Sequence, residues 1–549
     1  MINLKLSKIF AEFALMLEYK EESIFKVNAY RQAARTLKKI SDLDKYVGED
    51  RLGELPGIGK NLKEKILEYY RTGKIAEYEN LKKEIPLIIF DLLKIPGIGV
   101  KTAKLIYKTF NPNHLDEVES LAKAHKLKEI AGIGSKTEQQ ILIGIAAARE
   151  WQEKIPISLY SRNQEEIIDF LRNIPGVLKV SSTGMLRLKE EIIPYYHYLL
   201  VYDSSPADFI KAMESMGFNL INRGDGYLFL APEGFKIKIE FSTADNWGSN
   251  LFNSTGPEVF LKNFGSIEGK FEAEELIFSS RNLPFIDPEI RTSENIFTYL
   301  QERSLDDLIN LSAIKGDLHV HSKHSDGVNT IEELAKASQK LGYEYLAITD
   351  HSKSLTVAKG LDEERLLAEI EEVENLNREL TGITVLKGIE VDILKDGTLD
   401  LPDKLLSELD VVVASVHTGF KLSGEEQTAR IVQAIKNEHV DIIGHPTGRL
   451  LGRRGQYEVD VEEIIVNASK FKTALEINSS PERLDLKDEY VVRAREEGVL
   501  IAINTDAHDT TRLGNDLKYG VTVGRKALLT KEQVLNAKAL KELKKFLRR

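Results

Sequence analysis

The stretch that decides the fold of the C-terminal part of the chain is Gly316-Asp317-Leu318-His319-Val320-His321. Its apolar residues alternate with polar ones, which is typical of a β-strand, and its two histidines stand at positions i and i+2. Side chains at that spacing point to the same face of a strand. We therefore expect the two imidazoles to project together into one site.

Short apolar runs recur after this stretch, and each run ends in a polar or charged cluster. Helical patterns separate the runs, over residues 331–341, 363–380, 427–437 and 487–497. Alternating strands and helices with polar residues at the strand ends are typical of an α/β barrel whose site lies at that face. The expected strands are 345–349, 384–389, 411–415, 440–443, 473–477 and 499–503.

Histidines are concentrated in this part of the chain, where residues 316–510 hold eight of the 11. The chain has no cysteine, so any metal must be bound by His, Asp and Glu, a ligand set that suits Mn²⁺, Zn²⁺ or Fe²⁺. Any one of these histidines alone could be an ordinary core or surface residue, and His324 and His439 lack a strand-end position. The candidate ligands are His319, His321, Asp326, His351, Glu390, His417, His445, Asp506 and His508.

Nine ligands are enough for two or three divalent ions, with Glu390 as a bridge between them. Such ions lower the pKa of a bound water and hold the oxygens of a phosphoryl group, so the expected reaction is phosphoester hydrolysis. A neighbouring carboxylate such as Asp392 is a candidate for proton transfer. Nearby arginines could bind a phosphate, or could be plain solvated charge; they are Arg449, Arg453, Arg454 and Arg483.

These nine positions resemble the metal-ligand set of the PHP family (polymerase and histidinol phosphatase) of phosphoesterases. The matching motifs include the His-x-His at His319, the Gly-His-Pro at His445 and the Asp-x-His at Asp506. The resemblance implies a distorted (β/α)7 barrel with a trinuclear centre. It also implies that a metal-bound hydroxide is the nucleophile.

Residues 1–150 show helical patterns only, together with a Gly-x-Gly turn that occurs three times. A helix pattern follows each turn, and backbone N–H groups at such a position bind phosphate, although a single copy can be a mere tight connection. The turns resemble helix–hairpin–helix motifs, which implies sequence-independent contact with the DNA backbone and a monovalent cation at the turns. Their residues are Gly57, Gly59 and Lys60; Gly97, Gly99 and Lys101; and Gly132, Gly134 and Lys136.

The charge of the chain is unevenly distributed along its length. The net charge is −11, yet residues 1–150 carry 26 basic against 21 acidic residues, which is compatible with nucleic acid bound at the front. The beginning of the sequence lacks the apolar core of a secretory signal, and no apolar run approaches the roughly 20 residues of a membrane span. We expect a cytoplasmic protein that makes no membrane contact.

Essentially all 549 residues resemble the family X DNA polymerases of bacteria and archaea that carry a C-terminal PHP domain. The motif over residues 28–34 with the first glycine turn, and the stretch over 283–291, carry the resemblance outside the barrel. In relatives a lysine after the first turn can attack an abasic sugar, and Lys65 takes that position, with an ordinary exposed lysine as the alternative. The implied multidomain architecture is a small helical DNA-end-binding domain (1–82), helical fingers (83–152), an α+β nucleotidyltransferase-like palm (153–247), a small thumb (248–308) and the PHP barrel (313–549).

The palm departs from the family at its catalytic positions. A polymerase palm needs three aspartates on neighbouring strands to hold two Mg²⁺ ions. Glu240 and Asp203 are nearby, but a shift of one residue along a strand turns a side chain to the other face. We therefore expect a palm with weak or no nucleotidyl transfer that serves as a platform for DNA. The aspartate positions fall on Tyr195 and His197, or on Tyr196 and Tyr198 in a second alignment, and on Lys238.

Three hypotheses on function remain open. The first is a Mn²⁺-dependent 3′–5′ exonuclease or phosphoesterase of DNA repair, including base excision repair, that acts as a monomer on gapped, nicked or 3′ DNA ends. It would hold two to three divalent ions, Mn²⁺ or alternatively Zn²⁺ or Fe²⁺. The second is an active gap-filling polymerase with an appended exonuclease, and the third is a DNA-binding scaffold whose metals are structural.

Overall fold

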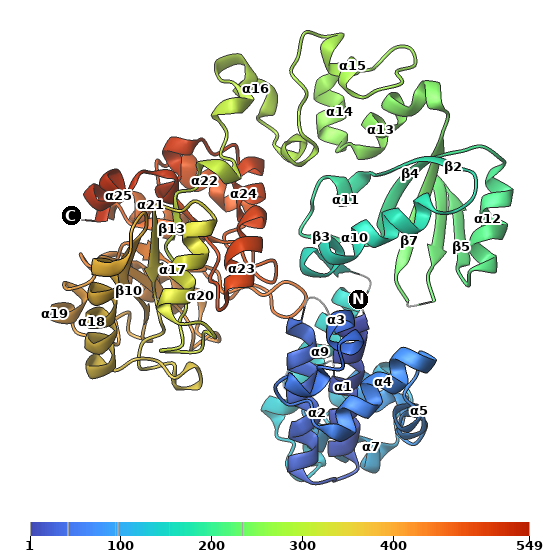
Figure 1. Cartoon of the computed structure of the whole chain (residues 1–549), viewed down its shortest axis with the longest axis horizontal. Helices are drawn as coiled ribbons and strands as arrows, with labels where there is room; N and C mark the ends of the chain where they lie inside the picture. Colours follow the sequence, from blue (N-terminus) through green and yellow to red (C-terminus); the bar gives the residue numbers. More distant parts are fainter. Residues whose placement is uncertain are drawn as a thin grey trace. The chain divides into compact units, whose positions relative to one another are not determined.

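The computed structural model of the chain describes residues 2–40, 43–93, 95, 98–152, 154–232 and 234–547. Two compact units make up the chain, residues Met1–Glu153 and Lys154–Arg549 (Figure 1). The first unit is helical, and the second combines three sheets, of two, five and seven strands, with helices.

The first unit packs its helices around one apolar core, as the helical patterns predicted. Phe10 and Phe13 of one helix contact Tyr30 of the next, with ring centroids 5.6 and 4.5 Å apart. All three side chains are buried, so the first two helices form a stable pair. The helices are α1 (Ile2–Tyr19), α2 (Ile24–Lys39), α3 (Leu43–Gly48), α4 (Lys60–Thr72), α5 (Ala76–Lys83), α6 (Leu87–Leu93), α7 (Val100–Phe110), α8 (Leu115–Lys123) and α9 (Ser135–Gln152), with 3-10 turns η1 (Leu52–Glu54) and η2 (Leu127–Glu129).

The palm is a five-stranded sheet in the order β2-β4-β7-β6-β5, in which β4 and β7 are parallel and the other neighbours antiparallel. Tyr196, Tyr198 and Leu200 alternate along β4 into a core that includes Phe209 of α12. The next residues along, such as Leu199, face Trp247 on the other side. The elements are β1 (Ile155–Pro156), α10 (Ile157–Arg172), β2 (Val177–Ser182), α11 (Gly184–Arg187), β3 (Ile192–Ile193), β4 (Tyr196–Tyr202), α12 (Pro206–Ser215), β5 (Asn219–Gly224), β6 (Gly226–Leu230) and β7 (Lys236–Ser242).

The thumb is helical and encloses a buried arginine. Arg291 lies among phenylalanine rings, with its guanidinium 5.1 Å from the ring centroid of Phe278, and it donates to Glu274 at 2.6 Å. Arg187 of the palm donates to the same carboxylate, so one buried ion network joins palm and thumb. The helices are α13 (Trp247–Thr255), α14 (Glu258–Phe264), α15 (Glu275–Ser279) and α16 (Ile296–Glu302), with η4 (Pro288–Thr292).

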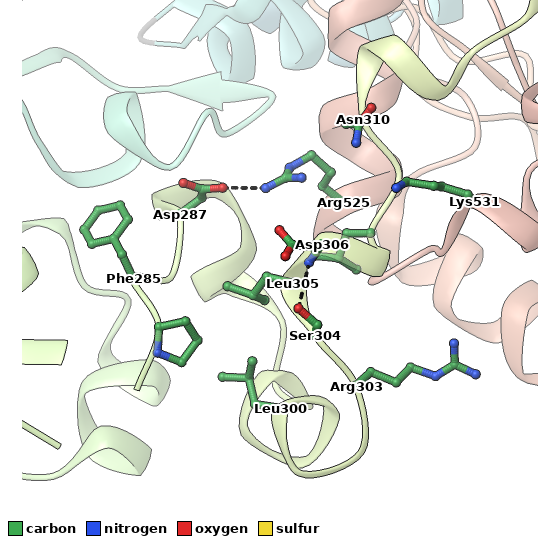
Figure 2. Close-up of a pocket in the computed structure, with 12 residues that line it drawn as sticks. Phe285, Asp287, Leu300, Arg303, Ser304, Leu305, Asp306, Asn310, Arg525 and Lys531 are labelled. Atoms are coloured by element: carbon green, nitrogen blue, oxygen red, sulfur yellow. Dashed lines mark hydrogen bonds and ion pairs between the residues drawn. The ribbon is translucent and has the colours of Figure 1, made fainter. Parts of the chain in front are cut away.

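A pocket of about 590 Å³ lies where the thumb meets the barrel (Figure 2). Arg525 of the barrel contacts Asp287 of the thumb at 2.5 Å. The Arg303 side chain points away from Arg525 and Lys531, so the basic groups do not converge (Figure 2). No candidate metal ligand is among the residues that line this pocket.

The barrel is a sheet of seven parallel strands in the order β14-β13-β12-β11-β10-β9-β8. A parallel bridge between Val320 and Ala507 brings its two edges together, so the sheet is nearly closed. This confirms the distorted (β/α)7 barrel. The strands are β8 (Gly316–Asp317), β9 (Tyr345–Ile348), β10 (Thr384–Asp392), β11 (Val411–Ser415), β12 (Ile442–Ile443), β13 (Ala474–Asn478) and β14 (Ile501–Asn504).

Helices surround the barrel strands (Figure 1). Several begin at capping residues: Thr330 and Glu333 form a capping box at α17, and Ser423 and Glu426 form one at α20. These caps fix the loops between strand ends and helices, which is where the candidate ligands lie. The helices are α17 (Ile331–Lys340), α18 (Glu363–Glu379), α19 (Asp403–Leu406), α20 (Gly424–Ile435), α21 (Val461–Phe471), α22 (Asp488–Glu496), α23 (Thr510–Asn515), α24 (Leu517–Lys526) and α25 (Leu540–Leu547).

The opening strand of the barrel is shorter than its sequence pattern predicts. β8 covers only Gly316–Asp317, because side chains beyond it replace the regular ladder. The backbone N–H of Leu318 donates to Asn504 Oδ1 and that of Val320 to Thr349 Oγ1. Within the described ranges, no helix is long and apolar enough to span a membrane.

Candidate metal centre

Side chains from distant parts of the barrel meet in three overlapping groups. In each group the candidate ligand atoms lie within 4.8 Å of one another. His321 and His351 each belong to two groups, so the groups are continuous. They are His321, Asp326, His351 and His508; His319, His321 and Asp506; and His351, Glu390 and His417.

Glu390, near the end of β10, lies among five imidazoles, of which that of His321 is 3.6 Å from Oε2. Its Oε1 is 3.0 Å from Nε2 of His445 and 3.3 Å from Nε2 of His417. Its Oε2 is 2.7 Å from Nδ1 of His351, and Oε1 lies 3.4 Å from Nε2 of His319. The structure thus places His445 beside the three groups and brings all nine predicted residues together.

The second half of the centre is arranged around two aspartates. Oδ1 of Asp506 lies 3.1 Å from Nε2 of His321, and Oδ1 of Asp326 lies 3.2 Å from Nε2 of His508. His321 is fully buried, whereas Asp326 and His508 have side chains that are 37% and 29% exposed. The centre is therefore open to solvent on the side of Asp326 and His508.

The buried carboxylates of the centre favour the ionised form, which suits bound cations. Burial opposes ionisation of Glu390 and Asp506, yet the surrounding imidazoles hold the pKa of both carboxyls well below their usual range. Burial likewise opposes protonation of His417, but Glu390 and Asp392 raise its pKa to about 10. At His321, burial and the nearby imidazoles of His508 and His351 instead lower the pKa to about 4.

Buried nitrogen atoms without hydrogen-bond partners show that the residues fit a metal. Among the described residues, Nδ1 of His445 makes no hydrogen bond, and neither do Nε2 of His319 and Nε2 of His321, although carboxylate oxygens lie 3.4 and 3.1 Å from the latter two. Buried polar atoms normally have a partner, so each such atom calls for an explanation. Nitrogen and oxygen donors without sulfur suit divalent ions such as Mn²⁺, Zn²⁺ or Fe²⁺, and the site is compatible with them.

Two carboxylates outside the ligand set hold imidazoles in place. Glu476 of β13 lies 2.8 Å from Nδ1 of His319 and accepts from the backbone N–H of His445 at 2.7 Å. Asp392 lies 3.0 Å from Nδ1 of His417. An imidazole that donates through Nδ1 keeps its Nε2 lone pair for a metal. Sequence reasoning missed Glu476, although a glutamate inside an apolar strand run was a visible signal.

The four candidate arginines have different surroundings. Nε of Arg483 lies 3.5 Å from Asp506, so Arg483 borders the centre. Arg453 is exposed, and Arg454 donates to the carbonyl of Gly448. Arg449 forms two hydrogen bonds with Glu191 of the palm and a third with the Leu484 carbonyl. The guanidinium of Arg449 is thus already occupied by protein groups, so we do not retain it as a phosphate ligand.

The palm positions expected to carry polymerase aspartates form an ion cluster. His197 is opposite Lys238 in the parallel pairing of β4 and β7, and both contact Oε1 of Glu240 at 2.9 Å. Lys238 also contacts Asp225 at 2.9 Å. Burial opposes ionisation of Glu240, but His197 and Lys238 lower its pKa. An imidazole and an ammonium group thus surround the carboxylate.

The strand register distinguishes the two alignments of the palm. Tyr196 and Tyr198 point into the apolar core, whereas His197 shares its face with Lys238. Tyr195 lies two residues before His197, and their rings are 5.7 Å apart. The first alignment therefore puts an expected aspartate position, His197, on the face that carries Lys238, whereas the second puts both positions in the apolar core. Asp203 lies beyond the far end of β4.

The glycine turns present exposed backbone at helix starts. Gly59 precedes α4, Gly99 precedes α7 and Gly134 precedes α9, and all three are exposed. The isoleucine inside each turn is buried and anchors it; these are Ile58, Ile98 and Ile133. Lys60 and Lys101 are exposed in the first turns of their helices, and Gly132 has a φ of +96°. Gly97 lies outside the described residues, as does the side chain of Lys136.

Gly57 shows why a glycine is required in the first turn. Its φ is +79°, a conformation that other residues rarely adopt, and an added Cβ would lie 2.6 Å from Cγ of Gln32. Lys65, in the following helix, is only 8% exposed, so it is not an ordinary exposed lysine. Its ammonium group contacts Glu77 and lies 5.7 Å from the ring centroid of Phe13.

Family models match three parts of the chain. The model of the PHP domain matches residues 317–480. The model of a helix-hairpin-helix domain matches residues 1–75, and that of a SAM-like helix-hairpin-helix tandem matches residues 89–147. These matches cover the three glycine turns and seven of the nine candidate ligands, since Asp506 and His508 lie beyond residue 480.

Relatives match the whole chain or the barrel alone. The DNA polymerase/3′-5′ exonuclease PolX of Bacillus subtilis is 36% identical over 569 residues, which is 99% of this chain and 98% of that protein. A probable phosphatase of Thermoanaerobacter sp. is 33% identical over 40% of this chain and 89% of its own length. A probable phosphatase of Caldicellulosiruptor bescii is 32% identical over 36% of this chain and 81% of its own length. The chain therefore belongs to the PolX family with a C-terminal PHP domain.

Proposed function

We propose that the protein is a Mn²⁺-dependent 3′–5′ exonuclease that acts in DNA repair on gapped, nicked or 3′ DNA ends through its barrel. The main support is the convergence of nine imidazole and carboxylate side chains in one partly open centre. The name of the Bacillus relative includes 3′-5′ exonuclease, and the relatives that match the barrel alone are named as probable phosphatases. Both names describe phosphoester hydrolysis.

The arrangement of donors suits two to three divalent ions held by the nine residues. Bound ions would supply an activated water and neutralise charge on a phosphodiester. Glu390 contacts His351 through Oε2 and His417 through Oε1, so it could bridge two ions. Glu476 orients His319, and Asp392 orients His417. Asp326 and His508 line the open side, so the scissile phosphate enters there.

Arg483 is the candidate that binds the phosphate of the substrate. Its side chain is 20% exposed and borders Asp506. A guanidinium in that place can donate to a phosphate oxygen that enters from the open side. Arg453 and Arg454, which lie in the loop after β12, are candidates for contacts with the neighbouring nucleotides.

The glycine turns are the proposed sites that bind the DNA backbone. Each offers backbone N–H groups at the start of a helix, and Lys60 and Lys101 add positive charge. Such contacts position DNA without reading its sequence. A monovalent cation at the turns, a monomeric state and the five domain boundaries given above belong to the same proposal.

The palm is proposed to hold DNA without transferring nucleotides. Lys238 and His197 surround Glu240 on the face where two Mg²⁺ ions would have to bind. An ammonium group there repels a cation at short range. The proposal therefore favours nuclease activity over gap filling.

Two assays separate the three hypotheses. A single-stranded oligonucleotide labelled at its 3′ end should be degraded with Mn²⁺ by the wild type and spared by His319→Ala. Extension of a gapped primer with Mg²⁺ would instead favour the polymerase hypothesis. If the protein shows neither activity but still binds DNA, the hypothesis of a scaffold with structural metals remains. Release of phosphate from a 3′-phosphorylated end would identify phosphatase action.

A further inference from the structure

A salt bridge connects the palm to the barrel beside the metal centre. Arg449 donates to Glu191 of the palm through two nitrogens, at 2.5 and 2.9 Å. Both side chains are mostly buried, at 10% and 19% exposure. A bidentate contact of this kind fixes direction as well as distance.

Arg449 also connects two loops of the barrel. Its own loop follows β12, which ends at Ile443, and includes His445, four residues earlier. Its guanidinium donates to the carbonyl of Leu484 in the loop after β13. The two loops share further contacts, because Thr447 donates to Asp485 and the N–H of Leu451 donates to the carbonyl of Glu482.

The same loops carry groups of the metal centre. His445 contacts Glu390 at 3.0 Å, and Arg483, next to Leu484, lies 3.5 Å from Asp506. A change in the direction of the Arg449 side chain is thus passed to a candidate ligand on one loop and to the candidate phosphate ligand on the other.

We propose that Glu191 is a positioning residue for the metal centre, which it acts on through Arg449. The palm then supports the barrel: its carboxylate fixes the guanidinium that holds the two loops in register. This inference rests on the proposed function of the barrel. It also gives the palm a role that needs no nucleotidyl transfer.

The chain offers a matched control in the preceding residue. Glu190 contacts Lys526 at 2.9 Å and so also joins palm to barrel. Lys526 is the last residue of α24, a helix that contains none of the nine candidate ligands. A general weakening of the contact between palm and barrel would affect both pairs, whereas the proposed role belongs to Glu191 alone.

The experiment compares Glu191→Gln with Glu190→Gln in the full-length protein. Mn²⁺ affinity is measured by isothermal titration, kcat and KM with a 3′-labelled oligonucleotide, and folding by thermal unfolding. We expect Glu191→Gln to weaken Mn²⁺ binding and lower kcat by about 10-fold, the lower end of effects at residues that orient metal ligands. KM of Glu191→Gln should change less than about 2-fold. Glu190→Gln should match the wild type in Mn²⁺ affinity and in kcat.

A double-mutant cycle tests whether Glu191 acts through Arg449. Glu191→Gln combined with Arg449→Gln should be no worse than Arg449→Gln alone, because the second change removes the same link. Arg449→Lys keeps the positive charge but loses the contact through two nitrogens, so it should lower Mn²⁺ affinity as well. The test therefore does not depend on Glu191→Gln alone.

Equal effects of the two glutamate variants, additive effects in the cycle, or wild-type Mn²⁺ affinity in Glu191→Gln and Arg449→Lys would each overturn the proposal. Failure of the proposed function gives a different result. In that case the wild type binds Mn²⁺ but degrades no DNA, and the affinity comparison still tests Glu191.

Discussion

Oε1 of Glu476 lies 2.8 Å from Nδ1 of His319, while Nε2 of the same imidazole faces Glu390 and Asp506. The other oxygen of Glu476 accepts from the backbone N–H of His445 at 2.7 Å. One buried carboxylate therefore orients two candidate ligands that follow different strands, β8 and β12. The backbone N–H of His445 and the side-chain amides of Asn478 and Asn504 all donate to this carboxylate, so both of its oxygens accept.

Glu476→Gln should weaken Mn²⁺ binding by about 10- to 100-fold, the usual cost of changing a residue that orients a metal ligand. The amide must point its NH₂ group at a donor, and His319 can accommodate it only by moving its proton to Nε2, the atom that faces the centre. Isothermal titration with Mn²⁺ measures the effect. Unchanged affinity would show that Glu476 does not set the orientation of His319.

A matched control for that experiment is Glu369→Gln, at a second buried glutamate of the barrel. Burial and the neighbouring Asp350 raise the pKa of Glu369 well above its usual range, which favours the neutral acid. The amide should therefore be tolerated, with Mn²⁺ affinity within about 2-fold of the wild type. A loss equal to that of Glu476→Gln would point to general damage of the barrel.

Glu274→Gln should destabilise the second unit in a pH-dependent way. Burial opposes ionisation of Glu274, but Arg187 and Arg291 lower its pKa below the ordinary value of 4.5. A lowered pKa stabilises the folded state above the unfolded value, and this stabilisation is lost as the pH falls through the folded value. At pH 7 the variant should lose about 3 to 5 kcal/mol, because it leaves buried guanidinium groups without a charged partner.

The measurement for Glu274 is chemical unfolding of wild type and variant at several pH values from 7 to 3. The difference in unfolding free energy between wild type and variant should be largest at pH 7. It should shrink below about pH 4.5, as the wild-type carboxylate takes up a proton. A difference that stays constant down to pH 3 would mean that ionisation of Glu274 contributes no stability.

No nucleotide should be added to a gapped primer by the wild type with Mg²⁺. Lys238 and His197 occupy the surroundings of Glu240, where cations would have to bind. Gel analysis of a labelled gapped substrate provides the measurement, with the Bacillus relative run in parallel. Extension that reaches the end of the gap would contradict the proposed role of the palm.

Lys65 should form no Schiff base with abasic DNA. Its ammonium group contacts Glu77 and the residue is only 8% exposed, so the amine is held against protein groups and away from a sugar in bound DNA. Borohydride trapping on an oligonucleotide with an abasic site measures this. A trapped adduct in the wild type that disappears in Lys65→Arg would assign lyase chemistry to this residue.

Much of the barrel could be predicted because local pattern and position agree there. The strand over 411–415, a buried apolar run flanked by polar residues, has the bounds that were predicted for it. The helix over 331–340 ends one residue before its predicted end. The nine predicted ligands meet because parallel strands present their carboxyl ends at one face. The α/β barrel therefore followed from periodicity, whereas its distorted seven-stranded form followed from the resemblance to the PHP family.

Contacts between distant segments were beyond the sequence. Glu191 and Arg449 are 258 residues apart, and no local pattern pairs them. The same holds for Lys65, whose burial depends on how α1 and α5 pack around it. The strand pattern through His321 gave too long a strand, because side-chain acceptors on Asn504 and Thr349 replace the ladder beyond Asp317.

The number of divalent ions bound per chain tests the central claim most directly. Mn²⁺ titration followed by elemental analysis of the full-length protein should give two to three ions for the wild type, and fewer for Glu390→Gln, which removes the proposed bridge. Binding of no ion, or the same number in Glu390→Gln as in the wild type, would contradict a metal centre built around Glu390.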